Sequence, residues 1–169
     1  IVQGVLTGGV SFYQVQGINK VFAEHPEINV VSSQAADWDA SKARAITETV
    51  LQQHPDICAV IDVWDGQGVG TGAAIKQAGL SDKVFFITSG GGAQSMCDML
   101  KDGTFTAAYN YDAVGMGRDA WTAIMVALQN GQGGGAIKTQ IYSPYRYMTK
   151  DDVRDGTCFN PEEYARILR

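Results

Sequence analysis

Strand-length apolar runs alternate with helical patterns throughout the stretch from Ile1 to Tyr111. The runs are rich in Val, Ile and Phe, which is typical of strands buried on both faces of a sheet. They lie at Ile1–Thr7, Ile28–Ser33, Ile57–Val63, Val84–Thr88 and Phe105–Tyr111. Pro or Gly follows each intervening helical pattern, as expected where helices end. The alternation predicts right-handed crossovers and an α/β fold, a three-layer Rossmann-like parallel sheet with helices on both faces.

A longer helix is predicted over residues 113–129, where the alternation stops. Its apolar face carries Val114, Trp121, Ile124, Met125 and Leu128. The glycine-rich stretch at 130–135 then breaks the chain.

The C-terminal part is expected to be short and simple. An extended segment is expected near Lys138–Tyr147, and a short helix begins at Asn160-Pro161, with Asn as its N-cap. We therefore expect one domain over 1–150, in which 112–135 holds the long helix and its break, and a tail over 151–169.

Charge and hydropathy argue against several kinds of partner. The formal net charge is -5, whereas nucleic acids and anionic membrane surfaces are bound through Lys and Arg. No apolar run approaches the roughly 20 residues of a membrane span. No signal peptide is recognisable, so the chain is either cytosolic or already trimmed, and its immediate start on a strand suggests a fragment of something longer.

Two strand-to-helix turns each carry a tryptophan beside a carboxylate. Trp38 lies between Asp37 and Asp39, and Trp64 precedes Asp65. Such turns meet at the carboxyl edge of an open α/β sheet, where ligands bind. A flat apolar ring beside a carboxylate suits a molecule with C–H faces and hydroxyl edges, such as a sugar or polyol. The alternative is that both indoles belong to the core.

The carboxylates also have structural interpretations. Asp39 directly precedes a helical pattern, which makes it an N-cap. Asp65 either caps the next helix or accepts hydrogen bonds from ligand hydroxyls. No metal site is predicted, because further oxygen ligands are missing close to Asp37 and Asp39.

The glycine-rich stretch at 66–72 follows a strand and opens a helix, which is the context of a dinucleotide-binding turn. Its spacing does not match, because Thr71 stands where the third glycine belongs, and the next strand ends in Thr88-Ser89 without an acidic residue. Small residues that permit close helix packing are the simpler interpretation. The next turn, Ser89–Gly92, is either a flexible link or a set of backbone N–H groups for an oxygen-rich ligand.

Neither catalysis nor a cofactor is indicated. His25 and His54 precede Pro at helix ends, so no nucleophile has a histidine base in its local context. Cys58 lies in an apolar run and is expected to be buried. Cys97 and Cys158 can pair if the protein is exported, but the sequence does not set their separation in space.

The motifs QAADWD, HPDI, a strand ending in WD, and DGTFTA with a following glycine occur in this order. Together they resemble the C-terminal lobe of type I periplasmic binding proteins, above all the ribose-type sugar receptors of ABC transporters. The resemblance covers about residues 1–150. It implies a two-lobed receptor, periplasmic or extracellular and lipid-anchored or soluble, that binds a sugar or polyol and delivers it to a membrane permease. The N-terminal lobe is missing from this chain.

The resemblance also implies where the ligand binds. The implied ligand-binding residues are Gln14, Trp38, Trp64, Asp65, Ser89, Asn110 and Tyr111. Trp38 falls where the family stacks an aromatic ring. Gln14 replaces a usual Arg, and Trp64 stands where many sugar receptors have Asn.

Two further slots are less sharply aligned. One, usually Asp, falls on Ser89 or Gly90, and the hinge slot, usually Gln, falls on Asn110 or Tyr111. These departures argue against ribose itself and favour another monosaccharide, a polyol or a less polar ligand.

The predicted helix over 113–129 resembles the segment that crosses to the other lobe. Burying its apolar side chains is worth about 1.5–3 kcal/mol each, so we expect the fragment to self-associate through this helix. The same fold also serves as the effector-binding domain of regulators related to the lactose repressor, which is the alternative function. A nucleotide-binding enzyme domain is the third hypothesis.

Overall fold

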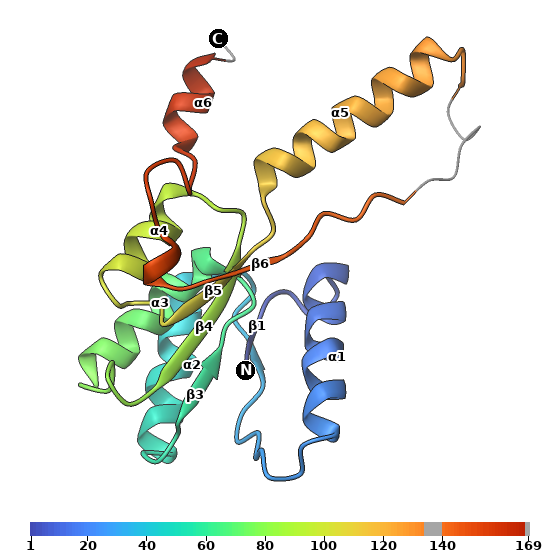
Figure 1. Ribbon diagram of the computed structural model, residues 1–169. Coiled ribbons are helices and arrows are strands. Elements are labelled where there is room, and N and C mark those ends of the chain that lie inside the picture. The colour runs from blue at the N-terminus through green and yellow to red at the C-terminus, as the bar shows by residue number, and fades with distance from the viewer. Residues whose placement is uncertain (134–139, 168–169) are drawn as a thin grey trace.

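The computed structural model describes residues 1–133 and 140–167 (Figure 1). Strands and helices alternate from the first strand to the fifth, so the predicted α/β fold class is confirmed. The elements are β1 (Val2–Gln3), α1 (Gly9–Ala23), β2 (Gln34–Ala35), α2 (Ala40–Gln53), β3 (Ala59–Ile61), α3 (Asp65–Gln77), β4 (Phe85–Gly90), α4 (Gln94–Lys101), β5 (Ala107–Asn110), α5 (Ala113–Gln129), β6 (Arg146–Met148), the 3-10 helix η1 (Lys150–Asp152) and α6 (Pro161–Ile167).

The strands before α5 are parallel to their neighbours. β1 pairs with β2, and β3, β4 and β5 pair in that order. A parallel bridge from Val2 to Asp62 places β1 beside the end of β3. β6 departs from this pattern, because it pairs antiparallel with β5, with Met148 opposite Ala108. It ends the segment expected to be extended near Lys138–Tyr147, of which residues 138–139 lie outside the described part.

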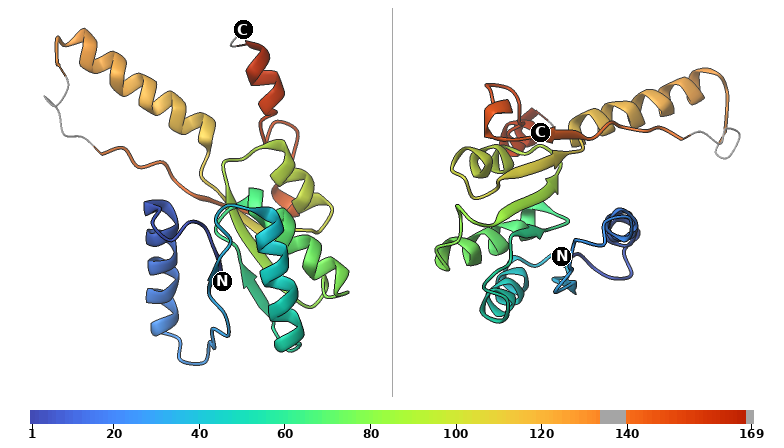
Figure 2. Two further views of the ribbon diagram at one scale, coloured as in Figure 1. Left: turned by 180° about the vertical axis from the view of Figure 1, so that it is seen from behind. Right: turned by 60° about the horizontal axis from the view of Figure 1, so that its bottom comes forward.

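Helices lie on both faces of the sheet: α2, α3 and α4 cover one face, and α1 lies on the other (Figures 1 and 2). The core forms under α3 and α4, where Phe86, Met96, Leu100 and Phe105 are almost fully buried. Each such side chain contributes about 1.5–3 kcal/mol by leaving water. Phe85 is 43% exposed, because successive strand residues point to opposite faces.

Glycines allow α3 to approach its neighbours closely. A Cβ added to Gly70 would lie 1.8 Å from the backbone oxygen of Ala40 in α2, and one added to Gly72 would lie 2.4 Å from the side chain of Thr104. Neither position has room for a side chain. The packing interpretation of the glycine-rich stretch at 66–72 is therefore confirmed for these two residues.

Two local expectations are wrong. The strand expected at Ile28–Ser33 forms later, as β2, because the register pairs Val2 with Gln34. Residues 28–32 run past the start of β1, and no described residue forms a strand pair with them there. They border an apolar groove of about 370 Å³ beside β3. Cys58 was expected to be buried, but it lines this groove and is exposed.

The tail after residue 150 is covalently tied to the domain. Cys158 forms a disulfide with Cys97 in α4, with their Cα atoms 6.2 Å apart. The pairing that the sequence left open is thus present, and such bonds persist in oxidising compartments. α6 begins as predicted, since the Asn160 side-chain oxygen accepts a hydrogen bond from the Glu162 N–H (3.0 Å).

The long helix α5 has the predicted bounds and projects away from the sheet (Figure 1). All its residues are described, and none of them is buried. On its predicted apolar face, Trp121 and Leu128 are 63% and 64% exposed. No helix in the described part of the chain is both long and apolar enough to traverse a lipid bilayer.

Candidate functional site

The two indoles of the Trp-Asp turns meet at the carboxyl edge of the sheet. The ring centroids of Trp38 and Trp64 are 5.9 Å apart, and the rings cross at 86°. This edge-to-face geometry is favourable for aromatic pairs. Both side chains are half-buried, which leaves part of each indole accessible. The pair therefore forms an apolar wall at the edge where α/β sheets bind ligands.

Each indole lies against a glycine. A Cβ added to Gly4 would approach Trp38 within 2.2 Å, and one added to Gly66 would approach Trp64 within 2.3 Å. Gly66 is the first glycine of the stretch that resembles a dinucleotide-binding turn. The Trp64 ring therefore covers this glycine at the place where a phosphate would have to approach the backbone.

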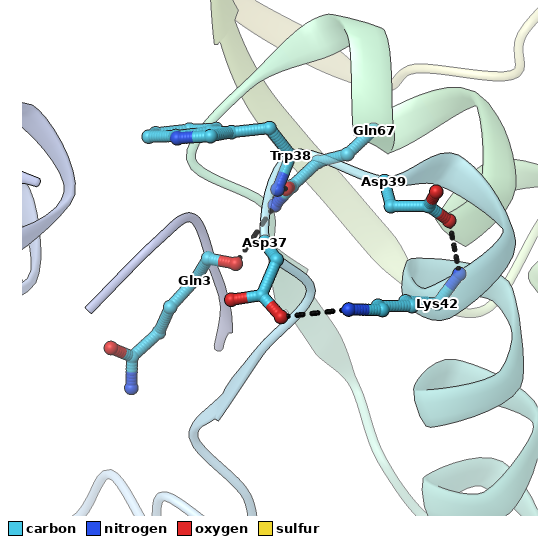
Figure 3. A network of polar contacts seen from close by, with 6 residues as sticks. All are labelled: Gln3, Asp37, Trp38, Asp39, Lys42 and Gln67. Carbon is cyan, nitrogen blue, oxygen red and sulfur yellow. Dashed lines mark hydrogen bonds and ion pairs between the residues drawn. The ribbon is translucent and has the colours of Figure 1, made fainter. Parts of the chain in front are cut away.

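The backbone of the first turn is held in an unusual conformation. Asp37 and Trp38 have φ of 54° and 64°, a left-handed region that costs non-glycine residues about 1–3 kcal/mol each. Three contacts support it (Figure 3). The Trp38 N–H donates to Gln67 Oε1 (3.1 Å), and the Lys42 ammonium pairs with Asp37 (2.9 Å). Asp39 accepts from the Lys42 N–H (2.8 Å), which confirms its prediction as an N-cap.

Gln67 is the centre of a buried network that sequence reasoning missed. Its Nε2 donates to the carbonyl of Gln3, the last residue of β1 (3.2 Å). It also donates to Oδ1 of Asp62, the residue that follows β3 (2.8 Å). Asp62 also accepts hydrogen bonds from the Thr71 hydroxyl (2.7 Å) and the Trp64 N–H (3.1 Å). The network thus ties both tryptophan turns to the ends of two strands.

The Asp62 carboxylate in this network is strongly desolvated. Asp62 is 1% exposed, and burial raises its pKa to about 6, while hydrogen bonds from Thr71, the Trp64 backbone and Gln67 oppose that rise. One sequence signal could have found the network. Gln67 and Thr71 are spaced four apart, which places two polar side chains on one face of a helix otherwise lined by small residues.

Two polar side chains, one from α1 and one from β4, are linked at the same sheet edge. Gln14 Nε2 donates to the Ser89 hydroxyl (3.3 Å), which in turn donates to the Val63 carbonyl (2.7 Å). The other side-chain atom of Gln14, Oε1, is buried and has no hydrogen-bond partner among the described residues. A buried acceptor without a donor costs about 1–3 kcal/mol. Gln14 Oε1 is therefore an unsatisfied acceptor that is enclosed by the protein near this edge.

Asp65 follows Trp64 directly and lies against the end of β4. It is the first residue of α3, not its N-cap, so the capping alternative is not realised. Its carboxylate packs on Gly90, where an added Cβ would lie 2.2 Å from Oδ2. Burial raises the pKa of Asp65 to about 6. Hydrogen bonds from the backbone N–H groups of Gly66 and of Asp65 itself oppose this rise. Burial and the Asp65 charge also raise the pKa of the Tyr111 hydroxyl.

The structure brings most of the predicted ligand-binding residues to one edge. These are Gln14, Trp38, Trp64, Asp65, Ser89 and Tyr111. Asn110 is buried at the end of β5, where its Oδ1 accepts from the Asp112 N–H (2.7 Å) and its amide lies against Gly92. Its contacts fix the turn into α5. Across residues 1–133 and 140–167, no three His, Cys, Asp or Glu side chains gather in a way that would hold a metal ion.

Comparisons with known proteins agree on one family. A sequence model described as the periplasmic binding protein domain matches residues 1–133. The D-apiose import binding protein of Paraburkholderia graminis is 36% identical over 69 residues, which are 41% of this chain and 22% of that protein. The D-allose-binding periplasmic protein of Escherichia coli is 28% identical over 116 residues, which are 69% of this chain and 37% of that protein.

Solved structures are similar over nearly the whole chain. An ABC transporter solute-binding protein from Agrobacterium vitis, bound with α-D-tagatopyranose, superposes with a TM-score of 0.76 and 27% identity. The match covers 93% of this chain and 51% of that one. The chain therefore spans about half of the solved protein, and 22% and 37% of the two curated relatives.

Proposed function

This chain belongs to the periplasmic binding protein domain family, and we propose that it forms the C-terminal lobe of a sugar receptor for an ABC transporter. Periplasmic sugar-binding proteins are not enzymes, so the task of the site is recognition. In this proposal the chain supplies one wall of an interlobe cleft. The missing lobe supplies the opposite wall, and closure of the two lobes presents the loaded receptor to a permease.

The indole pair, together with the polar side chains of Asp65 and Gln14 at the same sheet edge, carries the proposal. Sugars combine C–H faces, which pack on aromatic rings, with hydroxyls that donate and accept hydrogen bonds. Gln14 Oε1 is buried in this structure, so a ligand hydroxyl would donate to it only after the Gln14 side chain turns toward the cleft, and that bond would satisfy the acceptor. Trp38 would stack on the ring, and Asp65 and Tyr111 would contact other hydroxyls. Ser89 would act by positioning Gln14, because its hydroxyl is already bonded to Val63 and Gln14.

Each indole has a different expected role. Trp38 takes the family's stacking position, and its turn is anchored by Gln67. Trp64 stands where a polar side chain is usual, so it would reject a hydroxyl at that point and favour a C–H or methyl group. Asn110 would act indirectly, because its oxygen is already engaged by Asp112.

The same proposal gives roles to the remaining parts of the chain. Residues 112–135 would cross to the other lobe, where the exposed face of α5 would be covered. The receptor would work in the periplasm or outside the cell, as a soluble or lipid-anchored protein. The disulfide agrees with an oxidising compartment.

A ligand screen on the full-length protein that contains this chain tests the proposal. Relatives named for D-apiose, D-allose, ribose and xylitol define the first panel for thermal shift and calorimetry. We expect one of these ligands to stabilise the protein saturably, by about 2.7 kcal/mol at a hundredfold excess over Kd. The change Trp38→Ala should weaken that ligand at least about tenfold, which is 1.4 kcal/mol.

Phe85→Ala is the matched control, because it removes an exposed aromatic ring at the start of β4, at the opposite end of that strand from Ser89. It should leave the affinity unchanged. A panel in which no sugar or polyol binds contradicts the proposal, and equal affinity in Trp38→Ala shows that this indole is only structural.

A further inference from the structure

An apolar groove continues from the proposed sugar site into the protein. It has a volume of about 330 Å³ and lies between the N-terminal ends of α3 and α4. Trp64, Asp65 and Tyr111 border it on the side of the site. Its volume falls near the lower end of the range seen for small-molecule pockets.

The rest of the groove is lined mainly by apolar side chains. These are Val69, Met96, Met99, Phe105 and Phe159. Met96 and Phe105 are each 1% exposed, so they form a fixed floor. A hydroxyl placed against this floor would find no side-chain partner among those residues, and burying it unpaired costs about 1–3 kcal/mol.

Phe159 is held in the lining of the groove because the tail is bonded to the domain around it. The Phe159 N–H donates to the Gly92 carbonyl (2.9 Å), and the Gln94 N–H donates to the Phe159 carbonyl (2.8 Å). The preceding residue, Cys158, is bonded to Cys97 in α4. Three links therefore hold this part of the tail against α4 and the turn before it.

We propose that this groove is a subsite for an apolar substituent carried by the sugar, such as the alkyl aglycone of a small glycoside. The inference rests on the proposed sugar site, since the groove opens beside Asp65 and Tyr111. Asp65 would hold a ring hydroxyl at the mouth, and the substituent would extend over Met99 to Phe159. Phe159 is then a specificity-determining residue supplied by the C-terminal tail.

A first experiment tests the groove without any sugar. The full-length protein is labelled with ¹³C-methyl methionine, assigned by single Met→Leu variants, and titrated with 1-butanol as an apolar probe. We expect saturable shifts of the Met96 and Met99 signals, and only weak linear shifts of Met116 and Met125 on α5. Formamide, a small polar control probe that is not a polyol, should shift none of them.

Two variants locate the response. Ser95 borders the groove and is exposed, so Ser95→Phe places a ring in the groove from its rim and should abolish the saturable shifts. Gln94→Phe adds the same ring at an exposed neighbour that does not line the groove, and it should preserve them. Unresponsive Met96 and Met99, or an unchanged response in Ser95→Phe, overturn the subsite.

A second experiment links the groove to the sugar. Methyl and n-propyl glycosides of D-allose, D-ribose and D-apiose are compared by calorimetry. Each buried CH₂ is worth about a fourfold gain in affinity, so an n-propyl glycoside should bind about fifteenfold tighter than the methyl glycoside. Ser95→Phe should remove that gain and leave the methyl glycoside's affinity unchanged.

Equal affinities of methyl and n-propyl glycosides overturn the subsite and leave the sugar receptor intact. Failure of every glycoside and parent sugar to bind, with Met96 and Met99 still responding to butanol, overturns the proposed function instead. In that case the groove still binds apolar molecules, but the proposal that it binds a substituent of a sugar is wrong.

Discussion

Replacing Asp62 by Asn should change how the stability of the protein depends on pH. Burial raises the pKa of Asp62 from 3.8 to about 6 in the folded state. The folded protein therefore holds this proton more tightly than the unfolded chain. The stability that comes from this group is fully present below pH 3.8 and is lost as the pH rises through about 6. At neutral pH the loss is about 3 kcal/mol.

Asn is a close isostere that removes the titration and keeps the network. Its side-chain oxygen can accept from Gln67 and the Trp64 N–H, and its amide can donate to the Thr71 hydroxyl, which then acts as acceptor. The free energy of unfolding of Asp62→Asn, minus that of the wild type, should rise by up to about 3 kcal/mol between about pH 4 and pH 7.5.

Urea unfolding followed by indole fluorescence, at closely spaced pH values, measures this difference. Asp65 has a pKa raised to about 6 as well, so the wild-type curve contains both groups, and Asp65→Asn separates them. Asp82→Asn, at an exposed turn, controls for the loss of one negative charge. Parallel curves for Asp62→Asn and wild type would refute the claim that Asp62 is buried in the charged form at neutral pH.

Three further predictions concern the aromatic wall, the tail and α5. Gly66→Ala should destabilise the protein by about 1–3 kcal/mol and shift the indole emission, because its Cβ would meet Trp64; unchanged emission would contradict the packing described. Cys97→Ser should lower the free energy of unfolding by about 4 kcal/mol under oxidising conditions, because the disulfide closes a loop of 61 residues. An unchanged urea midpoint would show that the disulfide does not form in solution. The isolated chain should form a dimer through α5, which light scattering would detect. Trp121→Glu should shift the chain towards monomer, because a charge would enter the apolar face. A wild-type chain that is monomeric at high concentration would contradict this prediction.

Part of the candidate site was predictable because its residues sit at recognisable local positions. Trp38, Trp64 and Asp65 follow strands directly, and the parallel pattern alone brings such turns to one edge. The pairing of Gln14 with Ser89 joins residues 75 positions apart, so no local pattern could show it. The indole pair likewise depends on two turns meeting in space.

The Asp62–Gln67 network was missed for a related reason. In the sequence Asp62 belongs to a strand-length apolar run, where a polar residue carries no partner information. Only the folded chain shows that the Gln67 amide lies between the ends of β1 and β3. The two residues therefore acquire their role as support for the Trp38 turn from tertiary packing.

The sequence by itself determined the alternation of strands and helices, the bounds of α5 and the caps at Asp39 and Asn160. These features depend on residues within one or two turns of each other, so local periodicity and capping chemistry are enough to set them. Tertiary structure alone decided the position of β2, the exposure of Cys58, the antiparallel β6 and the disulfide. Each of these depends on which distant segment lies alongside, and strand register is a property of two segments together.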